Sequence, residues 1–274
     1  MIVGLFVLVG VWTLVAAWQD VRTTIVANWI TLSLVPTVLV YRLLFGWGAF
    51  LEGLLGLGVM VLLTLGLYYG KVFGGADAKL LWGYGAALPW AFLVGVSGVA
   101  GIVLGIFGFI ILLFASGVVW SLLWGLTIVS QRKERFRKEL RQAMCGWRSL
   151  LIGFIILAVP SLLFVGTWLV LLFLVLGFIW LYARALDKSM VVRQRPEHLI
   201  EGDWLKEKVR VGGKWIVPTA HGLSLDQIAA LQKAKKSAVI QQGAPFIPGF
   251  VLALAITAYA FFFLELFWVS FLGF

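Results

Sequence analysis

Residues 2–22 read IVGLFVLVGVWTLVAAWQDVR, an apolar run that ends at the polar group Gln19 to Arg22. A helix rises about 1.5 Å per residue, so a helix over Ile2 to Trp18 comes close to crossing about 30 Å of hydrocarbon. The run lacks the basic start and the small-residue cleavage site of a signal peptide. It therefore predicts a retained membrane span.

The composition of the 274-residue chain supports a membrane protein. Hydrophobic residues make up 62% of the chain and charged residues 12%, with a mean hydropathy of +1.03. Soluble domains are about 45–50% apolar and about 25% charged, and a soluble domain of this size cannot bury so much apolar surface. The same composition excludes disordered and collagen-like chains. A disulfide-rich chain is excluded because Cys145 is the single cysteine.

The hydropathy pattern predicts an all-α polytopic membrane protein with about eight transmembrane helices, six being the alternative. After the first span, further spans are expected at residues 29–45 and 50–69, two between 77 and 129, two between 148 and 184, and one at 247–271. The turns inside the two long runs are placed at Gly95 to Gly98 and between Pro160 and Gly166.

The positive charges give a consistent orientation with the N-terminus outside. Every Lys and Arg except Arg42 then falls in the predicted cytoplasmic segments, which are residues 19–28, 70–79, 130–148 and 184–246. Lys and Arg are enriched in cytoplasmic loops. The net charge of +10 is therefore interpreted as a topology signal, and no nucleic-acid partner is expected.

The segment 185–246 predicts a small cytoplasmic α+β appendage. Residues 208–211 and 214–217 flank Gly212-Gly213 as two short strands flank a turn. Ser224 and Gln227 form a capping box that opens a short helix. The appendage is basic, so anionic lipid headgroups are its expected partner.

Two aspartates stand out among the acidic residues near the predicted membrane. Glu52 and Glu265 fall toward span ends, where they can reach the interface. Asp20 ends the first span and Asp77 opens the fourth, which places both carboxylates at the cytoplasmic rim. Ionisable residues at such positions are expected to be functional.

A close carboxyl pair can hold one proton, so that one member activates water while the other protonates a leaving group, as in aspartic proteases. Gly74, Gly75 and Ala76 precede Asp77 without a bulky side chain, which would let an extended peptide approach the backbone. The alternative is that the glycines form a simple turn and Asp77 caps the fourth helix.

The residues around both aspartates resemble the motifs of the type IV prepilin peptidase family. Gly74-Gly75-Ala76-Asp77-Ala78-Lys79 resembles Gly-x-Gly-Asp-x-Lys, with Ala76 in place of the second motif glycine. Asp20-Val21-Arg22, followed by Ala27-Asn28-Trp29-Ile30-Thr31, is similar to Asp-x-Arg followed by Pro-Asn-x-x-Thr, with Ala27 in place of proline.

The C-terminal part looks like the archaeal branch of that family, the preflagellin (prearchaellin) peptidases. Its matching segments are Gly222 to Ser224 and Gly243 to Pro248. The likeness covers residues 1–97 and 200–260 and is weak between 98 and 190.

The resemblance implies an aspartic endopeptidase that removes the short basic leader of prepilins or prearchaellins at the cytoplasmic face of the cell membrane. Asp20 and Asp77 map onto the catalytic pair. The residues that map onto motif support or substrate binding are Gly74, Gly75, Ala76, Lys79, Arg22 and Asn28. No metal or cofactor is expected. The alternatives are a presenilin-like intramembrane protease and a proton- or cation-coupled transporter that uses the aspartate pair.

These inferences combine into one predicted organisation. It consists of a membrane catalytic core with five spans at 1–130, a basic cytoplasmic loop at 131–148, a helical hairpin at 149–184, the appendage at 185–246 and a last transmembrane helix at 247–274.

Overall fold

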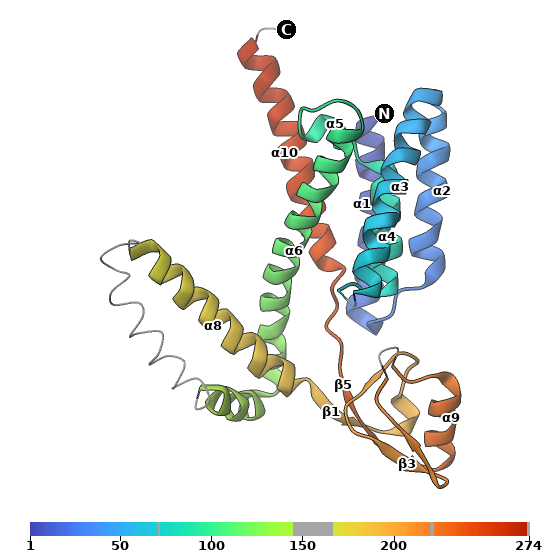
Figure 1. The fold of residues 1–274 in the computed structure, drawn as a ribbon, viewed down its shortest axis with the longest axis vertical. Coiled ribbons are helices and arrows are strands. Elements are labelled where there is room, and N and C mark those ends of the chain that lie inside the picture. The colour runs from blue at the N-terminus through green and yellow to red at the C-terminus, as the bar shows by residue number, and fades with distance from the viewer. Residues whose placement is uncertain (71, 145–166, 220–221, 273–274) are drawn as a thin grey trace. The chain divides into compact units, whose positions relative to one another are not determined.

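The computed structural model describes residues 1–70, 72–144, 167–219 and 222–272 and is mostly helical (Figure 1). The chain forms two compact units. The first comprises Met1–Ser121 with Ala244–Phe274, and the second comprises Leu122–Gly243. The predicted last transmembrane segment thus packs with the N-terminal helices, far from it in sequence.

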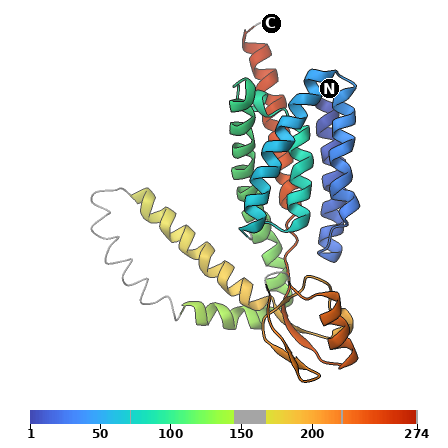
Figure 2. The same ribbon diagram turned by 45° about the vertical axis from the view of Figure 1, so that its right-hand side comes forward.

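The first unit is a helical bundle. Its helices are α1 (Ile2–Thr23), α2 (Asn28–Leu43), α3 (Trp47–Tyr69), α4 (Gly75–Ala87), α5 (Trp90–Leu93), the first part of α6 (Gly98–Gln131) and α10 (Pro248–Leu272). Helices α1 to α4 alternate in direction, and α10 packs beside α1 (Figures 1 and 2). The bundle therefore places the end of α1 and the start of α4 at the same end.

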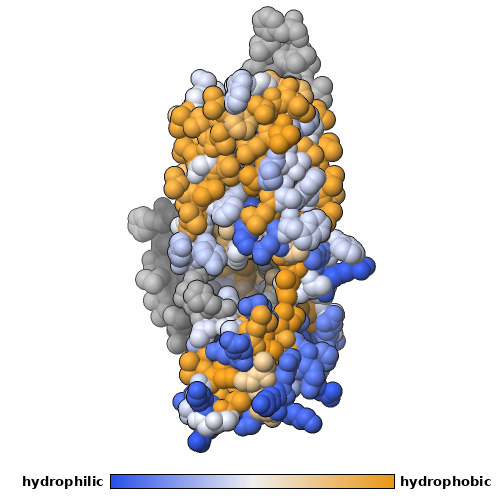
Figure 3. All heavy atoms as spheres, turned by 90° about the vertical axis from the view of Figure 1, so that its right-hand side faces the viewer, coloured by the Kyte–Doolittle hydropathy of each residue, from blue (hydrophilic) through white to orange (hydrophobic). Residues whose placement is uncertain are grey.

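Among the described residues, three helices are long and apolar enough to cross a membrane, namely α1, α3 and α6. A shorter apolar helix covers Pro248–Phe263. Apolar side chains cover the face of the bundle seen in Figure 3, as expected for helices in contact with lipid. The helices fit a membrane protein, but the predicted count of about eight spans is not confirmed.

Helix α4 is shorter than the predicted fourth span. It ends at Ala87 because Leu88 is extended, with ψ 146°, before Pro89. A residue that precedes proline is disfavoured in the helical region. The predicted turn at Gly95 to Gly98 is confirmed, since both glycines have positive φ values, +66° and +74°.

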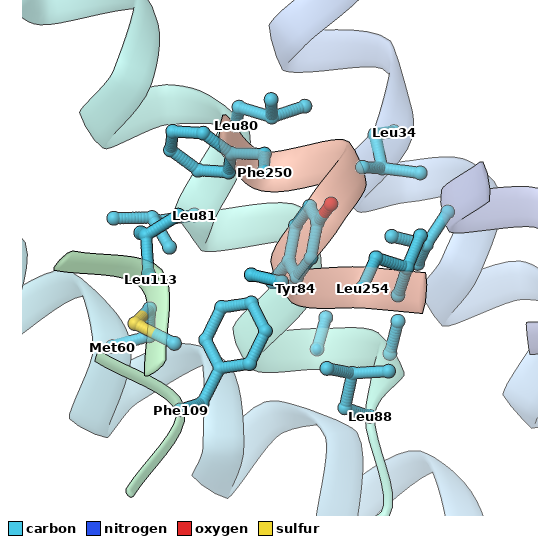
Figure 4. Packing of buried hydrophobic residues seen from close by; sticks show 14 of the residues in the cluster. Leu34, Met60, Leu80, Leu81, Tyr84, Leu88, Phe109, Leu113, Phe250 and Leu254 are labelled. Atoms are coloured by element: carbon cyan, nitrogen blue, oxygen red, sulfur yellow. The ribbon is translucent and has the colours of Figure 1, made fainter. Parts of the chain in front are cut away.

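The core of the bundle is built around Tyr84 of α4 (Figure 4). Its ring lies 5.2 Å from that of Phe109 and 5.8 Å from that of Phe250, measured between ring centroids. Helices α3 and α4 approach closely where Gly56 faces Gly85, since a Cβ on Gly85 would lie 2.8 Å from the Gly56 carbonyl oxygen. Such small-residue contacts are typical of helices that pack in membranes.

The second unit contains the α+β part. Its elements are β1 (Val191–Gln194), a 3-10 helix at Pro196–His198, β2 (Trp204–Leu205), β3 (Val209–Val211), β4 (Lys214–Ile216), α9 (Leu225–Lys233) and β5 (Ala238–Gln241). The sheet order is β1-β5-β2, with both pairs antiparallel.

Both local predictions for this part are confirmed. Strands β3 and β4 form an antiparallel hairpin across Gly212-Gly213, and Ser224 with Gln227 caps α9 reciprocally. The part has a hydrophobic cluster of its own, made of Leu199, Leu205, Ile216, Leu223, Ile228, Leu231, Ala238 and Ile240. It therefore does not depend on the membrane helices for a core.

The remaining described residues of the second unit are helical. Residues 133–144, within the predicted basic loop, form a helix. Helix α8 (Thr167–Ser189) occupies the second half of the predicted hairpin, whose turn between Pro160 and Gly166 lies outside the described residues. Arg132 donates a hydrogen bond of 3.0 Å to the Ser189 carbonyl oxygen, which joins the two ends of this region.

Candidate active site

The candidate site lies at one end of the interface between α1 and α4. In the middle of this interface, the hydroxyl groups of Thr13 and Tyr84 share a buried hydrogen bond of 2.8 Å. Both side chains are fully buried. Because a buried hydroxyl pair needs a close approach of the two helices, this contact fixes the register between α1 and α4.

That register brings the two aspartates opposite each other. Asp20 lies about two helical turns after Thr13, and Asp77 lies about two turns before Tyr84, a rise of about 10.5 Å in each case. Two turns return a side chain to nearly the same helix face. Because α1 and α4 run in opposite directions (Figure 1), this spacing from the Thr13–Tyr84 contact puts both aspartates toward the same end of the two helices, on the faces that carry that contact. Asp20 is near enough for its charge to act on Asp77.

Asp20 is held by the start of α10. Its side chain is 7% exposed, and its Oδ2 accepts a hydrogen bond of 2.9 Å from the Ile247 backbone N–H. The sequence alone does not predict this contact, because the two partners are 227 residues apart in the chain. The available signal was the pair of prolines, Pro245 and Pro248, that opens the last span.

Asp77 is held by its own helix. It occupies the third position of α4, and its Oδ2 accepts a hydrogen bond of 3.2 Å from the Gly74 backbone N–H. A Cβ on Gly74 would lie 3.1 Å from this oxygen, so a larger residue would crowd the carboxylate. The alternative that Asp77 is the N-cap of α4 is therefore wrong, because the N-cap is Gly74; Asp77 accepts the N–H of that residue from the third helical position.

The segments that hold the two aspartates pack against each other. Phe73, which precedes Gly74, lies 5.9 Å from Phe246, which precedes Ile247, measured between ring centroids. Phe73 also stacks on Phe114 of α6 at 5.3 Å. One aromatic cluster thus supports both backbone donors.

In the described part of the chain, the other residues predicted to support the site make their contacts with groups other than the two aspartates. Lys79 Nζ donates a hydrogen bond of 2.7 Å to Asn28 Oδ1, which joins α4 to the start of α2. Arg22 is exposed and lies over the Trp18 ring, 4.3 Å from its centroid. Gly75 and Ala76 form the half-buried first turn of α4. Lys79 therefore contacts the second motif segment, and Arg22 packs on its own helix.

The arrangement can perform acid–base chemistry. Each aspartate has one oxygen fixed by a backbone N–H, from Gly74 for Asp77 and from Ile247 for Asp20. Two facing carboxyl groups of this kind can share a proton and bind a water molecule between them. In the part of the chain that the structure describes, no group of three or more His, Cys, Asp and Glu side chains could hold a metal ion.

Residues 7–126, less than half of the chain, match the sequence model of the family described as the type IV leader peptidase family. Asp20, Asp77 and the residues around them lie inside the match, whereas Ile247 lies beyond it. No curated protein and no solved structure matches the chain. The N-terminal part of the chain is therefore similar to this peptidase family, which supports a protease.

Proposed function

We propose that the protein is a membrane-embedded aspartic endopeptidase. In this proposal it removes the short basic leader from prepilin-type or prearchaellin-type proteins at the cytoplasmic face of the cell membrane. The observation that carries it is the juxtaposition of Asp20 and Asp77 across α1 and α4, inside the part that matches the leader peptidase family.

The two carboxyl groups would divide the work of hydrolysis. The ionised aspartate takes a proton from a water molecule while the water oxygen bonds to the carbonyl carbon of the scissile peptide. The protonated aspartate gives its proton to the amide nitrogen as the carbon–nitrogen bond breaks. Because the aspartates lie where α1 ends and α4 begins, an extended substrate can reach them from the aqueous side of the membrane.

The position of the aspartates bears on the rival functions. Transporters of this kind place their ionisable residues near the bilayer midplane, often at helices broken in the middle. Here both carboxylates lie in the terminal turns of α1 and α4. A presenilin-like protease would use the same pair, and it differs in cutting within the transmembrane helix of its substrate.

The proposal is tested by incubating the purified protein with a tagged prepilin-like substrate and sequencing the new N-terminus. We expect one cut, at the junction between the basic leader and the apolar segment that follows. A cut inside the apolar segment would favour the presenilin-like alternative, and an intact substrate would contradict a peptidase.

Chelators are expected to leave this cleavage unchanged, because the proposed chemistry needs only the two carboxyl groups. The measurement is the cleavage rate with and without EDTA in the same assay. Loss of cleavage that is restored by added divalent ions would show that a metal site takes part instead.

We also propose that anionic lipid headgroups bind the outer face of the β3–β4 hairpin. Arg210 pairs with Trp215 across the hairpin, and Lys208 and Arg210 lie 5.4 Å and 6.0 Å from the Trp215 ring centroid. Ile216, which points to the opposite side, is buried. The exposed face thus combines an aromatic ring with two cations, as is common at membrane interfaces.

This binding predicts lipid-dependent protection of the hairpin. Amide hydrogen exchange of residues 209–216 should be slower in nanodiscs that contain anionic lipid than in purely zwitterionic nanodiscs. The difference should disappear in the double variant Lys208→Gln, Arg210→Gln. Equal exchange of the unmodified protein in both lipids would contradict the proposal.

A further inference from the structure

Residues 245–247, the segment before α10, are held in place by contacts with several helices. The Pro245 carbonyl oxygen accepts a hydrogen bond of 2.8 Å from Trp120 Nε1 of α6. The Phe246 ring packs on Phe73 and Phe250, at 5.9 Å from each, and lies against Gly117 of α6, where a side chain would displace it. Ile247 is 1% exposed. The Ile247 amide is therefore a fixed group, and it points at Asp20.

The position of Asp20 makes such a donor necessary. Asp20 lies in the last turn of α1, where the unpaired carbonyl groups carry partial negative charge and disfavour an ionised carboxylate. The same side chain is buried, which adds a desolvation cost to its charged form. The Ile247 N–H belongs to the N-terminal end of α10, where the partial charge is positive. The Ile247 N–H therefore opposes the partial negative charge of the α1 end and the desolvation cost, because it donates its hydrogen bond directly to Oδ2 of Asp20.

The bond also fixes the direction of the carboxylate. With Oδ2 held by Ile247, the carboxylate of Asp20 cannot turn freely about its side-chain bonds. A buried hydrogen bond to a charged group restricts the side chain more strongly than one between neutral groups.

We propose that the Ile247 backbone amide is a positioning group of the catalytic site. It aims Asp20 at Asp77 and stabilises the negative charge of its carboxylate. The helix that follows the α+β part thus completes a site whose other residues all come from the N-terminal helices. This inference rests on the proposed peptidase function.

The test removes the amide hydrogen and keeps the side chain. Replacing Ile247 by its α-hydroxy acid turns the N–H into an ester oxygen and leaves the buried side chain unchanged. The change should lower the cleavage rate at neutral pH roughly ten- to hundredfold and move the pH–rate profile about one to two units toward higher pH. The direction follows because loss of a donor to a carboxylate favours its protonated form.

Ile247→Val is the matched control, since it retains the amide, and its pH–rate profile should coincide with that of the unmodified protein. A profile that stays in place in the ester variant, or that moves equally in Ile247→Val, would overturn the inference.

A second readout does not depend on cleavage. In the Asp77→Asn background, the infrared carboxyl band of Asp20 should titrate at higher pH after the ester replacement than before it. An unchanged titration would overturn the positioning role even if the protein proves not to be a peptidase. Failure of the unmodified protein to cleave, with the titration shifted as expected, would contradict the proposed function alone.

Discussion

Asp20→Asn and Asp77→Asn are each expected to lower the rate of leader cleavage by roughly 10²–10⁴-fold. Asparagine keeps the shape of the side chain and can still accept the bond from Ile247 or Gly74. It cannot take up a proton from water or pass one to a leaving amine. The measurement is the single-turnover cleavage of a prepilin-like substrate by the purified variants.

The matched control for this experiment is Asp226→Asn, which makes the same chemical change at an exposed position in the first turn of α9. Its cleavage rate should equal that of the unmodified protein. Thermal unfolding in detergent should show that both site variants remain folded. Full activity in either Asp20→Asn or Asp77→Asn would contradict the proposed catalytic pair.

The second large effect is expected at the opposite end of the bundle, where Arg42 is buried. Its guanidinium donates to the carbonyl oxygens of Ala49 at 2.8 Å and Ala87 at 3.2 Å, and it pairs with Glu52 at 3.1 Å. The side chain is 1% exposed. Arg42 thus joins the end of α2 to the start of α3 and the end of α4.

Arg42→Met is expected to lower the free energy of unfolding by about 3–5 kcal/mol, because it leaves buried acceptors without a donor. The midpoint of thermal unfolding in one fixed detergent measures the effect. Arg137→Met is the control, since it makes the same chemical change at a side chain that is 56% exposed and whose loss should cost about 0–1 kcal/mol. Equal midpoints for Arg42→Met and the unmodified protein would show that this contact does not stabilise the bundle.

The aspartate pair could be anticipated from sequence because both residues lie at helix ends. The apolar run before Asp20 and the glycines before Asp77 mark where α1 ends and α4 begins. Helices that alternate in direction then bring those two ends together. The structure adds the register, through Thr13 and Tyr84, which no periodicity in the sequence specifies.

Other parts of the site depend on tertiary contacts and could not be predicted. The bond from Ile247 to Asp20 joins residues separated by most of the chain, and its donor is a backbone group that any residue except proline carries. Arg42 was the one cation outside the predicted cytoplasmic segments. The structure buries this side chain among backbone carbonyl groups, a contact that hydropathy and charge patterns do not predict.

The end of α4 was predictable in principle. Pro89 restricts Leu88 to an extended conformation, yet the surrounding apolar run conceals this break when only hydropathy is considered. A division of the long apolar run from 77 to 129 at Gly95 to Gly98 alone therefore misses the end of α4 at Ala87. Hydropathy locates membrane segments, whereas local backbone chemistry decides where each helix stops.

The pairing of β1 with β5 has an evolutionary consequence. Val191 and Gln241 are direct partners across the two strands, so the chain enters and leaves the α+β part at neighbouring positions. An insertion whose ends meet can change in length or be exchanged for another module without altering the path of the flanking chain. The α+β part can thus diverge in sequence and size without displacing the residues that precede β1 and follow β5.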